Sequence, residues 1–156
     1  MPAKDPTPLV RRLLRGDRWA AVAGAKLVAL REGYARVTMR LRPEHLNGVG
    51  VAQGGAVFTL ADFAFAAASN SHGTVAVALD VSITFARGTR TGVLTAEAHE
   101  ESVSRRVSVC NVRVTNAVGE VVALFRGSAF RKEDSIAALL AGAGRKRASR
   151  RPARAT

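Results

Sequence analysis

A single carboxylate lies in the middle of the longest apolar stretch of this 156-residue chain. Asp62 is the only charged residue between Glu44 and Asp80, and most of its neighbours are Ala, Phe, Leu or Val. An ionised carboxylate seldom enters such surroundings without a partner, because its desolvation costs several kcal/mol. Asp62 is therefore a structural carboxylate that holds backbone donors or an arginine, a carboxylate on a solvated stripe of the helix, or a candidate nucleophile or general base.

Two glycines precede this carboxylate at the expected start of a helix. The first N–H groups of a helix have no internal partner and carry the positive end of its dipole. Because Gly54 and Gly55 lack side chains, a ligand oxygen could approach these N–H groups closely and be polarised. An ordinary helix start, or close packing of the helix on a sheet, would explain the same pair.

The spacing of Gly55 and Asp62 predicts a site shared by two chains. Seven residues make nearly two helical turns, so both residues lie on one helix face but about 10 Å apart along the axis. One small carbonyl group could hardly touch both. In two antiparallel copies of the helix, Gly55 of one subunit would face Asp62 of the other, and we hypothesise an active site across a two-fold interface.

The remaining sequence predicts the elements that position this helix. Alanine content and length favour a helix over residues 54–70, apolar on every side and hence mostly buried. Apolar and polar residues alternate in the segments around it, which is typical of strands joined by short turns and paired antiparallel. The expected strands cover residues 25–30, 35–41, 75–85, 93–100, 105–115 and 120–131, with turns at 31–33, 87–92, 101–104 and 116–119 and a loop at 45–50.

This order predicts an α+β domain in which a curled antiparallel sheet surrounds one central helix. The predicted organisation is an N-terminal helical segment over residues 1–24, the domain itself over 25–131, and a short helix followed by a disordered basic tail over 132–156. The N-terminal segment is expected to form one or two short helices broken at Gly16, and the C-terminal helix is expected over residues 134–140.

Charge and composition limit the possible partners. The net charge is +12, and six of these charges lie in the final GRKRASRRPARAT, which has no acid; the rest of the chain carries +6. We interpret the tail as solubilising, although such a tail can also attract nucleic acid, anionic lipid or an acidic partner. The single Cys110 excludes an internal disulfide and has no neighbours at zinc-ligand spacing. No secretory signal or membrane span is recognisable, and we expect a cytoplasmic protein.

The run HLNGVGVAQGGAVFTLADFAFAAASNSHG, His45–Gly73, resembles the signature region of phenylacetate-pathway-type (PaaI-like) acyl-CoA thioesterases of the hotdog fold. That family has an H-x-N loop, H-G-G at the helix start, L-A-D two turns later and N-S near the helix end. Residues 82–88 and 122–127 also resemble the family, and the likeness covers about residues 20–131.

The resemblance implies hydrolysis of an acyl-CoA thioester, with an aryl or a medium-chain acyl group fitting equally well. Asp62 matches the family's catalytic acid, which acts as nucleophile or as general base. Gly55 matches the glycine whose N–H polarises the thioester carbonyl, and Asn47 matches the asparagine that places water or substrate. The family assembles its sites between subunits in dimers or tetramers. It uses no metal and no redox cofactor, and coenzyme A is part of the substrate.

Other polar residues near the signature are candidates for substrate binding. Gln53 and Gly54 adjoin the helix start, and His45 lies in the loop before it. Arg87, with Arg90, lies in a turn where a guanidinium group could meet the phosphates of coenzyme A. For His45 and Arg87, support of a loop and exposure to solvent are the alternative interpretations.

Two departures from the family pattern leave other functions open. Gln53 stands where the family has histidine, and glutamine cannot titrate near neutral pH. Ala78 stands where some relatives have a serine or threonine. The alternatives are a non-catalytic acyl-CoA-binding protein, or a hydratase or dehydratase that would pair His45 with Asp62. A nucleic-acid role of the tail is less favoured.

Overall fold

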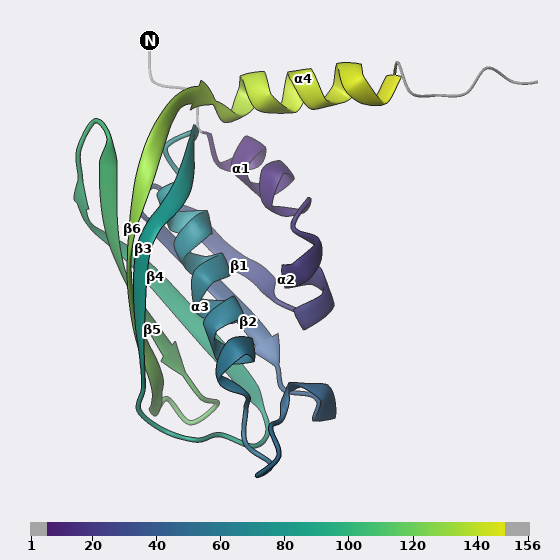
Figure 1. The fold of residues 1–156 in the computed structure, drawn as a ribbon, viewed down its shortest axis with the longest axis vertical. Helices are drawn as coiled ribbons and strands as arrows, with labels where there is room; N and C mark the ends of the chain where they lie inside the picture. The colour runs from purple at the N-terminus through teal and green to yellow at the C-terminus, as the bar shows by residue number, and fades with distance from the viewer. Residues whose placement is uncertain (1–5, 149–156) are drawn as a thin grey trace, which may run out of the picture.

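The alternating segments of the sequence form one antiparallel sheet that curls around a single long helix (Figure 1). The computed structural model describes residues 6–148. The sheet has the strand order β1-β2-β4-β5-β6-β3. Its strands are β1 (Lys26–Arg31), β2 (Tyr34–Arg40), β3 (Thr74–Phe85), β4 (Val93–Val103), β5 (Val107–Thr115) and β6 (Val121–Ser135). The predicted α+β arrangement is confirmed.

The central helix α3 (Gly54–Ser69) is held at both ends by polar side chains. At its start, the side-chain oxygen of Gln53 accepts hydrogen bonds from the first turn. At its end, the buried Asn70 donates to the carbonyl oxygen of Ala66 (2.9 Å) and accepts from the N–H of Ala76 (3.0 Å), which joins the helix to β3. Four of its alanines, Ala61, Ala64, Ala67 and Ala68, are fully buried, so the helix lies close to the concave face of the sheet.

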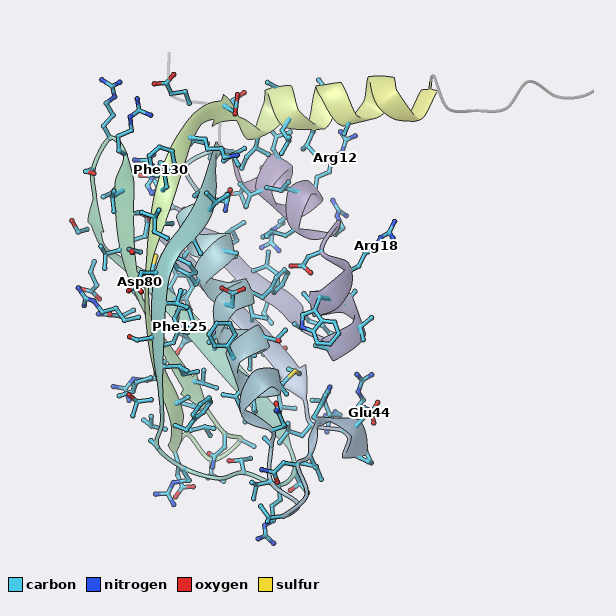
Figure 2. The ribbon with its side chains drawn as sticks, in the orientation of Figure 1. Arg12, Arg18, Glu44, Asp80, Phe125 and Phe130 are labelled. Atoms are coloured by element: carbon cyan, nitrogen blue, oxygen red, sulfur yellow. The ribbon has the colours of Figure 1, made fainter. Side chains whose placement is uncertain are left out.

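Aromatic packing fixes the position of α3 over the sheet. Phe125 points inward from β6, and its ring centroid lies 5.6 Å from those of both Phe58 and Phe65 on the helix. Figure 2 shows Phe125 between helix and sheet, whereas Asp80 lies toward the opposite, outer face of the sheet. The core is therefore the layer between α3 and the concave face.

Two short helices cover the side of α3 that the sheet leaves open (Figure 1). Helix α1 (Thr7–Leu14) and helix α2 (Arg18–Ala23) are separated at Gly16, as predicted. The carboxylate of Asp17 caps α2 by accepting from the N–H of Ala20 at 2.9 Å. Gly24, with φ +75°, ends α2 in a left-handed conformation and sends the chain into β1.

Several predicted boundaries are wrong at the C-terminal side of the domain. The predicted turn at 101–104 is strand up to Val103, because Ser102 and Val103 still pair with β5. Strand β6 runs to Ser135 rather than to Arg131. Helix α4 (Ile136–Ala148) replaces the predicted short helix and also occupies residues 144–148 of the predicted tail, since alanine, leucine, lysine and arginine favour helix. Residues 149–156 of that tail lie outside the described part.

The loop before α3 also contains a short element that the sequence did not indicate. Pro43–His45 form one turn of 3-10 helix. None of the helices within residues 6–148 has the length and apolar character needed to cross a lipid bilayer.

Candidate active site

Asp62 opens onto a cavity of about 360 Å³ between α3 and α2. The cavity is lined by Asp17, Trp19, Ala20, Phe58, Thr59, Asp62 and Phe63. The Asp62 side chain is half-buried, and within residues 6–148 its carboxylate takes part in no hydrogen bond or ion pair. Of the structural alternatives, a carboxylate held by backbone donors or an arginine is not what residues 6–148 form, whereas a carboxylate on a solvated stripe of the helix is still open.

Burial raises the pKa of the Asp62 carboxyl above its ordinary value of 3.8, and the negative charge of Asp17 raises it further. A carboxylate with a raised pKa is a stronger base than an ordinary one once it is ionised. The surroundings of Asp62 therefore suit a carboxylate that takes up a proton better than one that stays ionised in an ion pair.

Helix α2 supplies residues that the sequence did not single out. The indole Nε1–H of Trp19 donates to the Thr59 hydroxyl at 3.0 Å and holds the indole beside the cavity. Asp17 joins the cavity because it caps α2, and its carboxylate reaches the same space as Asp62. The one signal available beforehand was that Trp19 is the sole tryptophan of the chain.

The start of α3 is arranged differently from the prediction. The side-chain Oε1 of Gln53 accepts hydrogen bonds from the N–H of Gly55 and, at 3.2 Å, from the N–H of Ala56. The Gly55 N–H is therefore occupied by Gln53 instead of facing a ligand position. Gln53 acts as the helix cap in this arrangement.

The neighbouring Gly54 N–H has no hydrogen-bond partner in the part of the chain that the structure describes. Gly54 lines a second cavity of about 320 Å³, together with Asn47, Arg87 and apolar residues that include Phe85. A Cβ atom at position 54 would lie 3.1 Å from the Phe85 ring, so close packing also favours glycine here. The first N–H of α3 thus remains available beside this cavity.

The loop before α3 brings Asn47 to the cavity and leaves His45 outside it. The Asn47 side-chain oxygen accepts from the N–H groups of Val49 (3.1 Å) and Val51 (3.2 Å), which shapes the loop. His45 is only 6% exposed, and its Nδ1 accepts from the backbone N–H of Arg42 at 3.1 Å. His45 lines neither cavity, so its position supports the loop rather than a contact with substrate.

The turn after β3 places Arg87 at the rim of the second cavity. Arg87 is exposed, and its Nη1 lies 3.6 Å from Oε1 of Glu120, a surface ion pair that a phosphate could displace at small cost. The predicted companion Arg90 is exposed but does not line this cavity.

The predicted site residues therefore separate into two groups within one chain. Asp62 lines the first cavity, and Asn47, Gly54 and Arg87 line the second; no residue lines both. A single small group bound to one chain could not contact both sets. This separation agrees with the spacing argument, which required a second copy of α3.

The other histidines lie away from both cavities. His72, after the end of α3, is paired with the buried Glu100 of β4. His99 is exposed on the outer side of β4, and its ring centroid lies 4.8 Å from that of Tyr34. Neither residue is placed to meet Asp62.

Comparison with known proteins gives one family. Residues 49–123 match the thioesterase superfamily. The chain is similar to the acyl-coenzyme A thioesterase PaaI of Escherichia coli, with 38% identity over 120 residues, 76% of this chain and 86% of that protein. The solved structure of the E. coli PaaI protein from the phenylacetic acid degradation operon aligns with a TM-score of 0.81 and 34% identity, over 84% of this chain and 96% of that chain.

Two further solved structures are similar. A mutant of the phenylacetic acid degradation protein PaaI of Thermus thermophilus is 39% identical, with a TM-score of 0.71 over 74% of this chain and 100% of that chain. A thioesterase protein of Streptococcus pneumoniae, solved with coenzyme A, is 27% identical, with a TM-score of 0.72 over 78% of this chain and 95% of that chain.

Proposed function

Because this chain belongs to the thioesterase superfamily and is an acyl-CoA thioesterase, we propose that it hydrolyses an aryl- or medium-chain acyl-CoA with Asp62 as the catalytic carboxylate. The observation that carries the proposal is the position of Asp62, unpaired and half-buried in a cavity lined by Trp19, Phe58 and Phe63. The aromatic side chains offer an apolar surface for an aryl or medium-chain acyl group.

The chemistry requires Asp62 to be ionised. As a general base it takes a proton from a water molecule whose oxygen attacks the thioester carbonyl carbon; the C–S bond then breaks, and the thiolate of coenzyme A leaves and is protonated. As a nucleophile it attacks the same carbon directly; the C–S bond breaks, the thiolate of coenzyme A leaves and is protonated, and water hydrolyses the resulting anhydride to the free acid and the Asp62 carboxylate. In both routes negative charge develops on the carbonyl oxygen.

We assign the stabilisation of that charge to the Gly54 N–H in place of Gly55. The Gly54 N–H lies at the positive end of α3 and has no partner within residues 6–148, whereas the Gly55 N–H donates to Gln53. Gln53 then acts by ordering the first turn, which needs no titratable group. Asn47 and Arg87, beside Gly54, would position the substrate and its phosphates.

The proposed site contains Asp62 of one subunit and Gly54 of another. Strand β3 supports this assembly, because among the described strands it pairs only with β6 and leaves its other edge open. Val77, Leu79 and Phe85 on that strand are exposed, which is typical of a strand that another chain covers. A second copy added edge to edge would give a dimer, and such dimers could associate further into a tetramer.

The first test is thiol release from a panel of acyl-CoA esters: phenylacetyl, hydroxybenzoyl, short-chain and medium-chain. Asp62→Asn keeps the size of the side chain and removes the base, so we expect a loss of about a hundredfold or more. Asp80→Asn, which removes an exposed carboxylate on the outer face of β3, is the matched control and should retain wild-type rates. Equal activity of Asp62→Asn and wild type would refute the assignment of the catalyst.

The shared site can be tested by mixing two inactive variants. Gly54→Val should block the carbonyl position, and Asp62→Asn removes the base. If each site takes one residue from each subunit, a mixed dimer has one intact site, and random mixing of the two variants should restore about a quarter of wild-type activity. No recovery in a mixture proven to exchange subunits would contradict the interface.

A further inference from the structure

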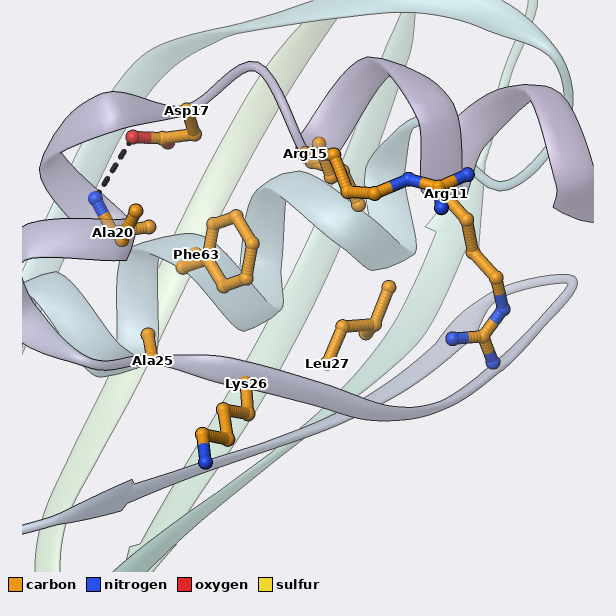
Figure 3. Close-up of a pocket in the computed structure, with 10 residues that line it drawn as sticks. Arg11, Arg15, Asp17, Ala20, Ala25, Lys26, Leu27 and Phe63 are labelled. Carbon is orange, nitrogen blue, oxygen red and sulfur yellow. Dashed lines mark hydrogen bonds between the residues drawn. The ribbon is translucent and has the colours of Figure 1, made fainter.

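A separate cavity of about 390 Å³ lies between α1, α2 and the edge strand β1 of the sheet. Figure 3 shows Arg11 on α1, Arg15 directly after the end of α1, and the Phe63 ring of α3 facing Leu27 of β1. The Lys26 side chain points to the opposite side of β1. The volume falls in the range of about 300–1,000 Å³ that small-molecule sites occupy. The cavity adjoins that of Asp62 through shared wall residues, among them Phe63.

The rim of this cavity carries unbalanced positive charge. Within the described residues, Arg11 and Arg15 form no ion pair with any carboxylate. Asp17 is the one acid of the lining, and its carboxylate caps α2 by accepting from Ala20. Two guanidinium groups against one carboxylate leave a net charge of +1 around the opening, which favours an anionic ligand.

The floor of the cavity is apolar. Leu14 and Ala20 are buried, Phe63 is only 7% exposed, and Leu27 packs against the core. A phosphate or other fully hydrated anion would gain from the rim alone, because the floor offers it no hydrogen-bond donor. A ligand with an anionic head and an apolar body would use both parts, the body displacing water from Phe63 and Leu27 while arginine binds the head in a bidentate manner.

We propose that this cavity binds an organic carboxylate with an aryl or alkyl body, at a site distinct from the Asp62 cavity. The acids that the proposed hydrolysis releases belong to this class, so binding at this site would make the enzyme respond to its own product. That consequence rests on the proposed function, whereas the proposed binding site itself does not. The ligand lies on the N-terminal helices and needs no second subunit, in contrast to the proposed catalytic site.

The experiment measures binding by calorimetry with octanoate as the probe. Acetate supplies the charge without the apolar body, octanamide supplies the body without the charge, and coenzyme A supplies phosphates. We expect octanoate to bind the full-length protein at least about tenfold more tightly than acetate or octanamide, since each lacks one of the two contributions.

The decisive variant is Arg11→Gln/Arg15→Gln, with Arg12→Gln/Arg18→Gln as the matched control. Both variants remove two positive charges from residues 11–18, but only Arg11 and Arg15 line the cavity. The first variant should weaken octanoate binding about tenfold or more, and the control should change it by less than about twofold.

If the two double variants weakened octanoate binding equally, the effect would come from the overall positive charge of the protein. That result would refute the proposed binding site. Octanoate binding that is lost in Asp62→Asn but retained in Arg11→Gln/Arg15→Gln would place the acid in the catalytic cavity and also overturn it. Tighter binding of coenzyme A than of octanoate, removed by the arginine variant, would assign the rim to phosphates instead. Calorimetry measures octanoate binding without any catalytic turnover. The binding test therefore remains valid even if the protein does not hydrolyse the thioesters of the panel.

Discussion

Replacing His72 with alanine should destabilise the protein by about 1–3 kcal/mol, the usual cost of leaving a buried polar group without its hydrogen-bond partner. The Nε2 atom of His72 is bonded to Oε2 of Glu100, whose side chain is only 3% exposed, and the His72 side chain is 17% exposed. The other oxygen of Glu100 is buried without a partner, and Glu32 contributes a longer contact of 3.7 Å to Nδ1 of His72. Alanine at position 72 would therefore leave both side-chain oxygens of Glu100 without a hydrogen-bond partner among the described residues.

For a chain of this length, that loss corresponds to a fall in melting temperature of roughly 2–12 °C. The assay is thermal and urea denaturation at neutral pH, followed by circular dichroism. His99→Ala is the matched control, because His99 is exposed on the same end of β4, and it should cost less than about 1 kcal/mol. The contact between His72 and Glu100 joins the segment after α3 to strand β4. Its loss should therefore also increase the mobility of α3, the helix that carries Asp62.

A double variant separates the pair from the individual side chains. If the cost of His72→Ala comes from the orphaned carboxylate, His72→Ala/Glu100→Ala should be more stable than the sum of the single variants predicts. A His72→Ala protein that unfolds within about 1 kcal/mol of wild type, or strictly additive single and double variants, would refute the reasoning.

Three further predictions concern the site and the core. Asp17→Asn keeps an acceptor for the cap of α2 but removes the charge that raises the pKa of Asp62, so the acid limb of the pH profile of kcat/KM should move to lower pH; a shift to higher pH would contradict this electrostatic assignment. Burial raises the pKa of the Cys110 thiol to about 11, so a disulfide reagent at pH 8 should modify the native protein at least about a hundredfold more slowly than the urea-unfolded chain. Gln53→Ala should cost about 1 kcal/mol of stability, measured by urea denaturation, because Gly55 and Ala56 lose their cap, while Gln53→Asn should restore most of it.

Local pattern was enough to predict the elements around the site. The sequence predicted α3 within one residue of its observed end, because a glycine pair and a run of alanines mark a buried helix. It failed in the β4–β5 hairpin, where Glu and Ser were interpreted as a turn. Pairing of Ser102 with Val109 continues the β4–β5 hydrogen-bond ladder through a bulge. This pairing outweighs the weak preference of Glu and Ser for a turn.

Long-range packing accounts for the site residues that the sequence missed. Trp19 and Thr59 are 40 positions apart, and no periodicity indicates that α2 covers this turn of α3. Asp17 enters the cavity for the same reason, and with it the charge that raises the pKa of Asp62. The choice between Gly54 and Gly55 depended on where one side-chain oxygen of Gln53 points.

The sequence by itself determined that an ionisable group lies within an apolar helix. It also determined that a glycine pair precedes this group at a distance too great for one carbonyl group to contact both. Those properties follow from residue type and helical rise, which need no knowledge of distant contacts. Only the tertiary structure decided which N–H remained free, that His45 supports a loop, and that α2 brings a second carboxylate toward Asp62. Hydrogen bonds, burial and charge depend on three-dimensional neighbours, and these come from segments that the chain order keeps apart.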